Sequence, residues 1–367
     1  MLLVAAAQTR QTLSKGDRML NIGVVGCGRI AQVRHLPEYL EHDGCHIVAV
    51  TDMNMDRALE IARQYHCHAD ASAEMLLARP EIDAVSVCVA NADHAAVTIH
   101  ALHAGKHVLC EKPMAITLDE CQKMVDTATK SNRVLVIGHN QRLLKTHQFV
   151  RNLIASGEIG QVLMWSSRFC HGGPESWSID KNNIWFFNRE RSAYGALFDL
   201  GIHKIDLMQY LLDDHVCAAF AITATQDKKD ADNRPIPVED NAICMLHMQG
   251  GSWGTVHASW TCYGKERNNT VIDGSLGTLR IYDHPVYACI VEKKTGEKSY
   301  YQTDEIQTNE KQTRSGIIDE FVRAILTGVP SVNAGRHALS SMRATFACLT
   351  SAQTHRIVEI NDSWING

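Results

Sequence analysis

Short, continuously apolar runs alternate with amphipathic stretches over the first 140 or so residues. The apolar runs predict buried strands over residues 20–25, 45–51, 84–89, 107–110 and 134–137. The stretches between them predict helices over residues 31–42, 57–66 and 95–104 and a fourth that begins at about residue 118. Strands that are apolar throughout and separated by helices are typical of a parallel sheet covered on both faces. We therefore expect a doubly wound α/β domain, a Rossmann fold, over residues 19–142.

After about Leu144 the strands become longer, and apolar and polar residues alternate within them. Strands of this kind are predicted over residues 162–168, 218–225, 242–248 and 252–260, with turn signals such as Gly250-Gly251 between them. The pattern indicates an antiparallel sheet. Helices are predicted over about 197–212, 315–326 and 334–354. We expect an α+β domain over residues 143–367 with a large, mostly antiparallel open sheet, which binds substrate and forms a homodimer or homotetramer.

The first eighteen residues begin with an apolar segment that lacks a basic leader and is short for the core of an export signal. Met19 stands directly before the first predicted strand. We expect residues 1–18 to be a disordered extension.

Composition and charge argue against two classes of protein, those that bind nucleic acid and those that lie in or on a membrane. The 367 residues are 45% hydrophobic and 21% charged, and the net charge is −5. A chain without an excess of basic residues is a poor candidate for binding nucleic acid or an anionic membrane. The longest apolar runs are also shorter than the roughly 18 residues that a membrane span needs. We expect neither a nucleic-acid partner nor a membrane.

The cysteines and histidines offer no clear metal site. Twelve cysteines occur without a CxxC pair, and most lie in apolar stretches, as buried thiols do in a reducing compartment. The triplet His66-Cys67-His68 is better explained as a turn after a helix, because three consecutive ligands rarely converge on one ion. We expect a cytoplasmic protein without a bound metal.

The first strand is followed by a glycine-rich turn, Gly26-Cys27-Gly28-Arg29-Ile30-Ala31, and the second strand ends at Asp52. This order of strand, turn, helix and acidic residue is the fingerprint of a dinucleotide site. Gly26 permits the tight turn, Gly28 lets a pyrophosphate approach, and Ala31 allows close packing of the helix on the sheet. Asp52 would accept hydrogen bonds from the ribose hydroxyls and repel a 2′-phosphate, so that NAD is favoured, with NADP as the alternative. A glycine turn without a cofactor, and Asp52 as a plain helix cap, are the structural alternatives.

Two further segments carry candidate chemistry. Glu111-Lys112-Pro113 ends a strand at the carboxyl edge of the parallel sheet, where ligands bind in open α/β folds, although a lysine there can equally be a solvated surface residue. Asp199 and His203 are four residues apart at the start of a helix and so share one helix face. They suit a substrate hydroxyl, with His203 as a general base. The alternative is a capping aspartate and a packed histidine.

Taken together, these motifs resemble those of the glucose–fructose oxidoreductase, inositol dehydrogenase and rhizopine-catabolism family (Gfo/Idh/MocA) of NAD(P)-dependent oxidoreductases. The matching segments are Gly23-Val24-Val25-Gly26-Cys27-Gly28-Arg29-Ile30-Ala31, Glu111-Lys112-Pro113, and the run from Gly195 through Asp199 and His203 to Asp206. They occur in family order and cover nearly the whole chain from about Leu20.

The resemblance implies roles for individual residues. Lys112 would bond the reacting hydroxyl, Asp199 would hold the substrate, and His203 would take the hydroxyl proton. The implied cofactor contacts are Gly26, Gly28, Arg29, Ile30, Ala31, Asp52, Asn91, His94, Glu111, Lys112 and Asn140. Tyr194 stands where the family often has glycine, and Trp185 lies in an aromatic-rich segment that could face a sugar ring or, alternatively, form core or a subunit interface.

The expected activity is the interconversion of a secondary alcohol and a ketone on a sugar, inositol or related cyclic polyol by hydride transfer. Two alternatives remain open. One is an NAD-dependent elimination from a glycoside without net redox change, and the other is a non-catalytic dinucleotide or sugar sensor. The sensors of the family tend to lack the lysine that Lys112 matches.

Overall fold

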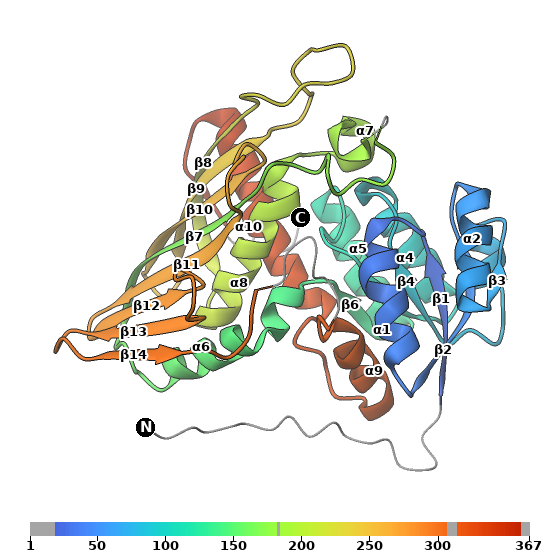
Figure 1. The fold of residues 1–367 in the computed structure, drawn as a ribbon, viewed down its shortest axis with the longest axis horizontal. Helices are drawn as coiled ribbons and strands as arrows, with labels where there is room; N and C mark the ends of the chain where they lie inside the picture. Colours follow the sequence, from blue (N-terminus) through green and yellow to red (C-terminus); the bar gives the residue numbers. More distant parts are fainter. Residues whose placement is uncertain (1–18, 182–183, 307–313, 361–367) are drawn as a thin grey trace.

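The computed structural model describes residues 19–181, 184–306 and 314–360 (Figure 1). The extension predicted for residues 1–18 lies outside the described residues. In Figure 1 a parallel sheet with its helices lies to the right, and a broader sheet backed by helices lies to the left.

The first sheet is parallel and has the strand order β3-β2-β1-β4-β5-β6. Its strands are β1 (Leu20–Val25), β2 (Cys45–Thr51), β3 (His68–Ala69), β4 (Ala84–Val87), β5 (His107–Cys110) and β6 (Leu135–Ile137). The helices are α1 (Leu36–Glu41), α2 (Met55–Tyr65), α3 (Ala73–Leu77), α4 (His94–His103) and α5 (Leu118–Lys130), and a π turn at Ala31–His35 precedes α1. The predicted Rossmann fold is confirmed. Because the strand order reverses between β1 and β4, a crevice opens at the carboxyl ends of these strands.

Local capping explains where the observed elements differ from the prediction. Helix α2 begins two residues earlier than expected, because the Asn54 side chain accepts a hydrogen bond from the Arg57 amide. It ends at His66 in the left-handed conformation, as the predicted turn requires. The short β3 and α3 that follow were not predicted, since two and five residues are too few to show a hydrophobic period.

The second sheet has nine strands in the order β14-β13-β12-β11-β7-β10-β9-β8-β15. They are β7 (Val162–Cys170), β8 (Val216–Ala224), β9 (Asn241–Met248), β10 (Trp253–Ser259), β11 (Arg267–Gly274), β12 (Gly277–Ile281), β13 (Cys289–Lys293), β14 (Lys298–Tyr301) and β15 (Val358–Glu359). Seven of the eight pairings are antiparallel, and β7 runs parallel to β10. The mostly antiparallel sheet is therefore confirmed, although β11 to β15 were not predicted.

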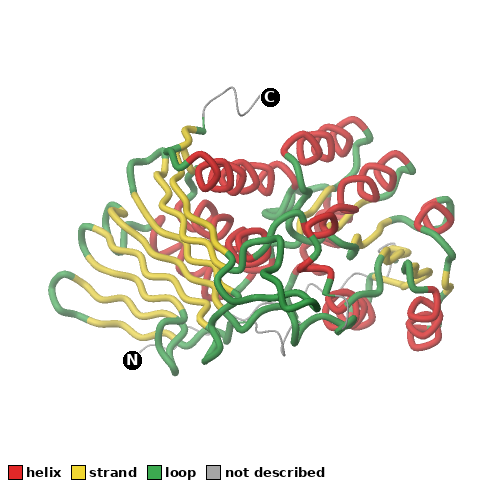
Figure 2. The backbone as a smooth tube through the Cα atoms, turned by 90° about the horizontal axis from the view of Figure 1, so that it is seen from above, coloured by secondary structure: helices red, strands yellow, loops and turns green. Residues whose placement is uncertain are grey.

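Helices cover one face of this sheet and leave the other open (Figures 1 and 2). The covering helices are α6 (Lys145–Ala155), α8 (Ile202–Leu212) and α10 (Gly335–Thr354). Helix α9 (Ile317–Thr327) instead packs into the core of the first sheet, where Ile317 and Phe321 are fully buried beside Leu20 and Ile22. The domain boundary near residue 142 stays a prediction. The chain returns to the Rossmann core with α9, after β14, and then adds the last strand, β15, to the second sheet.

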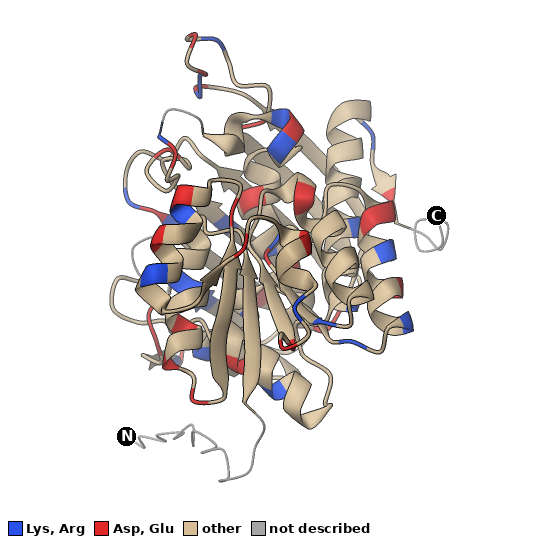
Figure 3. Ribbon diagram, turned by 90° about the vertical axis from the view of Figure 1, so that its right-hand side faces the viewer, with Lys and Arg blue, Asp and Glu red and all other residues tan. Residues whose placement is uncertain are grey.

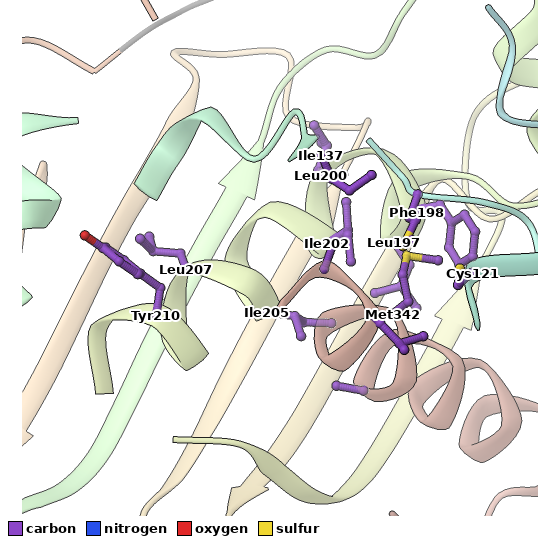
Figure 4. Close-up of a cluster of buried hydrophobic side chains, with 14 of the residues drawn as sticks. Cys121, Ile137, Leu197, Phe198, Leu200, Ile202, Ile205, Leu207, Tyr210 and Met342 are labelled. Carbon is purple, nitrogen blue, oxygen red and sulfur yellow. The ribbon is translucent and has the colours of Figure 1, made fainter. Parts of the chain in front are cut away.

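The segment that carries Asp199 and His203 is anchored by its apolar neighbours. Three apolar side chains of this segment are fully buried: Leu197, Phe198 and Ile202. They pack toward α10, whose Met342 belongs to the same cluster (Figure 4). Burial of a large apolar side chain contributes about 1.5–3 kcal/mol. The polar residues between these anchors are thereby held against the crevice.

Within the described residues, no helix combines the length and the apolar character that crossing a membrane requires. In the ribbon of Figure 3, the positions of Lys and Arg are interspersed with those of Asp and Glu.

Candidate active site

A cleft of about 620 Å³ runs along the carboxyl edge of the parallel sheet and continues under the second domain. It is lined by most of the predicted site residues: Gly26, Gly28, Arg29, Ile30, Asp52, Asn91, His94, Glu111, Lys112, Asn140, Trp185, Tyr194, Asp199 and His203. Ala31 does not line it, because its side chain is fully buried in the helix–sheet core. Segments that are far apart in the chain thus meet around one space.

The glycine-rich turn has the shape that a dinucleotide needs. Gly26 has φ +93°, and a Cβ at this position would lie 2.5 Å from the Cys88 carbonyl oxygen, so that only glycine fits. A Cβ added at Gly28 would have its nearest neighbouring atom 4.0 Å away, which leaves the backbone open to the cleft. The residues present fit a bound pyrophosphate at this turn.

Asp52 is fixed at the end of β2 rather than at a helix start. One carboxylate oxygen accepts a hydrogen bond from the Cys27 amide at 2.8 Å, and the other accepts from the Asn54 amide at 2.8 Å. Asn54 is the residue that caps α2, so the alternative in which Asp52 is the cap does not hold. The carboxylate is thereby placed beside the turn, at the position where a ribose diol would lie.

A guanidinium from α2 connects this end of the cleft to the second domain. Arg57 donates to Asp52 at 3.4 Å and to Asp180 at 2.7 Å. Asp180 also lines the cleft. Two carboxylates therefore share one arginine.

Glu111 is a buried, ionised carboxylate. Burial opposes its charge, but the hydrogen bond from His35 (2.9 Å) and the charge of Arg34 (3.4 Å) outweigh it and lower the pKa of Glu111 to about 2. The other oxygen accepts from the Lys112 amide at 3.2 Å. Glu111 thus stiffens the backbone that presents Lys112, in addition to the implied ribose contact.

Lys112 and Asp199 are directly paired. The ammonium donates to Asp199 Oδ1 at 2.9 Å and to the Asp199 carbonyl oxygen at 3.0 Å. Trp260 Nε1 donates to the remaining carboxylate oxygen at 3.1 Å. Burial opposes ionisation of Asp199, yet the charge of Lys112 and these hydrogen bonds hold its pKa below the usual value. Asp199 therefore stays ionised beside Lys112 at the cleft wall.

His203 lies on the same wall. Its side chain is 8% exposed, and its Nδ1 is buried without a hydrogen-bond partner among the described residues. Burial, and then the charge of Lys112, lower its pKa well below the ordinary value. The imidazole is therefore neutral at pH 7, which is the form that accepts a proton.

The turn before these residues is built so that the three groups converge. Gly195 packs against Glu239, where a Cβ would lie 1.9 Å from the carbonyl oxygen. The Glu239 carboxylate accepts from the Gly195 and Leu197 amides at 2.9 and 3.1 Å. A π turn at Leu197–Gly201 then leads into α8 and places Asp199 and His203 on the cleft wall.

Aromatic side chains form the outer wall of the cleft. Trp185 stacks on Phe186 with ring centroids 3.9 Å apart, and both residues line the cleft. Tyr194 also lines the cleft, with its ring 4.6 Å from that of Phe198. Such flat apolar faces suit the C–H faces of a sugar ring.

Two predicted cofactor contacts also hold the backbone around the cleft. Asn91 Nδ2 donates to the Ser192 carbonyl at 2.9 Å, which joins the first domain to the segment before Gly195. His94 Nδ1 lies 2.7 Å from the Pro113 carbonyl oxygen. Asn140 is 5% exposed and faces the cleft.

Several residues of this site were not predicted from the sequence; besides Arg57 and Asp180, they include Trp260, His171, Gln141 and Asn268. From the sequence, Trp260 was predicted only as the last residue of a strand. Trp260 lies behind the wall and bonds Asp199, whereas His171, Gln141 and Asn268 line the cleft. No motif identifies them, because each reaches the site only when the second sheet and the loop after β6 pack on α8. Alternation along β11 places Asn268 inward, and a prediction of that strand would have found it.

Solved structures share this fold. The levoglucosan dehydrogenase structure in complex with NADH and levoglucosan superposes with a TM-score of 0.82 at 22% identity, covering 94% of this chain and all of that one. The aldose–aldose oxidoreductase from Caulobacter crescentus superposes with a TM-score of 0.79 at 23% identity, covering 94% of this chain and all of that one.

Curated relatives are more similar in sequence. D-glucoside 3-dehydrogenase of Escherichia coli (strain K12) is 32% identical over 197 residues, which is 53% of this chain and 54% of that protein. The chain thus matches about half the length of this relative. Inositol 2-dehydrogenase of Gluconacetobacter diazotrophicus (strain ATCC 49037 / DSM 5601 / CCUG 37298 / CIP 103539 / LMG 7603 / PAl5) is 28% identical over 348 residues, which is 93% of this chain and 96% of that protein.

Family models match both domains in order. Residues 20–139 match the oxidoreductase family model with an NAD-binding Rossmann fold, and residues 147–280 match the GFO/IDH/MocA C-terminal domain. With the dinucleotide turn and the second sheet in place, the chain belongs to the Gfo/Idh/MocA family of NAD(P)-dependent oxidoreductases.

Proposed function

We propose that this protein is an NAD-dependent dehydrogenase that converts one secondary alcohol of a neutral sugar or inositol ring into a ketone, and that it runs the same reaction in reverse. The observation that carries the proposal is the meeting of Lys112, Asp199 and His203 on one wall of a cleft that continues to the glycine-rich turn.

The three side chains have complementary roles in this proposal. The glycine-rich turn and Asp52 would hold NAD, which would supply the acceptor for hydride from the carbinol carbon. The Lys112 ammonium donates a hydrogen bond to the reacting oxygen and stabilises the negative charge that develops on it. Neutral His203 accepts the hydroxyl proton. Asp199 orients the lysine through the 2.9 Å contact and accepts a hydrogen bond from a neighbouring hydroxyl.

The substrate class rests on the walls of the cleft and on the relatives. The Trp185 and Phe186 rings offer apolar faces, and the polar groups offer donors and acceptors for hydroxyls. Three of the similar proteins named above are dehydrogenases of a glucoside, levoglucosan and inositol, and the fourth is an aldose–aldose oxidoreductase. A cyclic polyol satisfies both sets of contacts.

A screen of methyl glucosides, levoglucosan and inositols with NAD and with NADP tests the proposal through the absorbance of the reduced cofactor. Accumulation of NADH with at least one polyol supports a dehydrogenase. Consumption of a glycoside without accumulation of NADH would instead favour the redox-neutral elimination. Absence of any turnover, together with retained NAD binding, would favour a sensor.

We also propose that the open face of the second sheet meets a second copy of the chain. Ile222, Ile243 and Met245 are 60%, 58% and 41% exposed there, and Trp253 lies on the neighbouring strand. Contiguous apolar surface of this kind is typical of subunit interfaces. Replacement of Ile243 by lysine is expected to lower the mass measured by light scattering, and an unchanged mass would contradict the assignment.

A further inference from the structure

A buried polar chain lies beneath the substrate end of the cleft. Lys204 Nζ donates to Gln141 Oε1 at 3.3 Å, and Gln141 Nε2 donates to Asn268 Oδ1 at 3.5 Å. The three side chains come from α8, from the turn after β6 and from β11. Lys204, Gln141 and Asn268 are 0%, 5% and 7% exposed. Gln141 and Asn268 line the cleft, whereas Lys204 lies behind them.

The ammonium dictates which way the two carboxamides face. Burial lowers the pKa of Lys204 to about 7, and in its protonated form the amine has only donors, so that it can bond only the oxygen of Gln141. The nitrogen of Gln141 is then turned toward Asn268, which must present its own oxygen in return. Asn268 Nδ2 is left without a protein acceptor among the described residues, on a side chain that lines the cleft. The hydrogen-bonded series from Lys204 through Gln141 thus ends at Asn268 Nδ2, a donor whose direction is fixed.

The position of Asn268 relates this donor to the catalytic groups. Asn268 is the cross-strand partner of Phe169 in the β11–β7 pairing, so the two side chains stand next to each other on the inner face of the sheet. The Phe169 ring centroid lies 5.7 Å from that of His203 and 5.9 Å from Lys204 Nζ. Phe169 is therefore a neighbour of His203, of Lys204 and of Asn268.

We propose that Asn268 is a specificity-determining residue that donates a hydrogen bond from Nδ2 to a hydroxyl oxygen on the far side of the substrate ring from the reacting carbon. Lys204 and Gln141 are positioning residues that hold its carboxamide in this orientation. The inference rests on the proposed dehydrogenase function and refines its substrate class to rings that carry a hydroxyl at this distal position.

The charges around the site favour a neutral hydroxyl over a carboxylate. The Lys112 ammonium is paired with Asp199, and the Arg142 guanidinium is paired with Asp206 through two contacts of 2.7 Å. Lys204 is screened from the cleft by Gln141. Beside these two pairs a substrate carboxylate would lose its hydration while each cation already has a carboxylate partner, which is costly.

The test compares Asn268→Ala with Asn269→Ala as a matched control, because Asn269 points to the opposite face of β11 and bonds Asp283. The probes are levoglucosan, methyl β-glucopyranoside and myo-inositol, each with its monodeoxy analogues. In the wild type, one monodeoxy analogue is expected to lose about tenfold in kcat/KM. Asn268→Ala is expected to raise KM for the parent by about tenfold, to keep kcat within about threefold, and to abolish the penalty for that analogue.

Lys204→Met separates positioning from a structural role. In this variant the deoxy analogue is expected to lose less kcat/KM relative to its parent than in the wild type, while kcat for the parent and NAD binding are retained. A general loss of structure would instead lower kcat and NAD binding as well. If Lys204→Met does not fold, Gln141→Leu carries the same expectation. An Asn268→Ala enzyme that keeps the wild-type KM and the full deoxy penalty would overturn the inference and leave the proposed function standing. Failure of the wild type to oxidise any of these polyols would remove both.

Discussion

The Lys112 ammonium and the Asp199 carboxylate lie 2.9 Å apart, although 87 positions separate them in the chain. Neither end of the pair is free to move. Lys112 is held by the backbone that Glu111 braces, and Asp199 is held by Trp260 and by the turn before α8. The pair therefore presents one fixed ammonium to the cleft, and this rigidity is what transition-state stabilisation needs.

Replacement of Lys112 by alanine is expected to lower kcat by about 100-fold or more, because the hydrogen bond to the developing alkoxide is lost. Binding of NAD, measured by calorimetry, is expected to stay within a few fold of the wild type. Lys123→Met on the exposed face of α5 is the matched control and should leave kcat unchanged. A Lys112→Ala enzyme with wild-type turnover would remove the residue from the catalytic role.

Replacement of His203 by glutamine is expected to lower kcat/KM by about 100-fold, since an amide cannot accept the hydroxyl proton. The pH profile of the wild type gives a second readout. The general base is active when neutral, and burial lowers the pKa of His203 well below its ordinary value of 6.5. The activity should therefore fall on acidification with a midpoint below pH 6.5. A midpoint above pH 6.5 that persists in His203→Gln would assign the base to another group.

The cofactor preference is expected to depend on Asp180 as well as on Asp52. Asp180→Asn removes one carboxylate partner of Arg57 and leaves the guanidinium available to a 2′-phosphate. The ratio of kcat/KM for NADP to that for NAD should rise about fivefold, the size of an ion pair worth ~1 kcal/mol. Asp213→Asn, which removes an exposed partner of Arg151, is the control. An unchanged ratio in Asp180→Asn would show that Arg57 does not reach the adenosine ribose.

Stability is expected to fall on mild acidification because of buried neutral histidines. Burial, followed by the charge of Lys204, lowers the pKa of His147 to about 3. Between pH 6.5 and 3 the unfolded chain binds a proton at His147 that the folded chain does not bind. The free energy of unfolding therefore decreases as the pH falls, by up to about 1.4 kcal/mol per pH unit from this residue.

Urea unfolding of the wild type and of His147→Asn at pH 6.5 and at pH 5 isolates this contribution. The loss of stability between the two pH values should be smaller in the variant, because the other buried histidines contribute equally to both proteins. Equal losses would mean that His147 does not stay neutral in the folded state.

The pattern of residues along the chain was sufficient to predict those parts of the fold and of the site that depend on residues close together in the sequence. The turn from Gly26 to Ala31 follows a strand and opens a helix, and Asp52 closes the next strand, so that the parallel order of the sheet brings them together. Asp199 and His203 are four residues apart where a π turn runs into α8, and this spacing alone brings both to the cleft wall. The parallel sheet, the mostly antiparallel second sheet and the family could be predicted on this basis.

Contacts between distant segments could not be predicted in this way. The Trp260 bond to Asp199, the bridge from Arg57 to Asp180 and the return of α9 to the Rossmann core carry no local signature. Each depends on how the second sheet packs against the helices and on where the chain crosses back.

The order of residues along the chain thus determined which chemical groups this protein has and which edge of a sheet presents them. The distances, the ionisation of those groups and the wall that selects a substrate arose only on folding. The physical reason is that periodicity and turn geometry act over a few residues, whereas burial and charge pairing act between surfaces that meet only in the packed molecule.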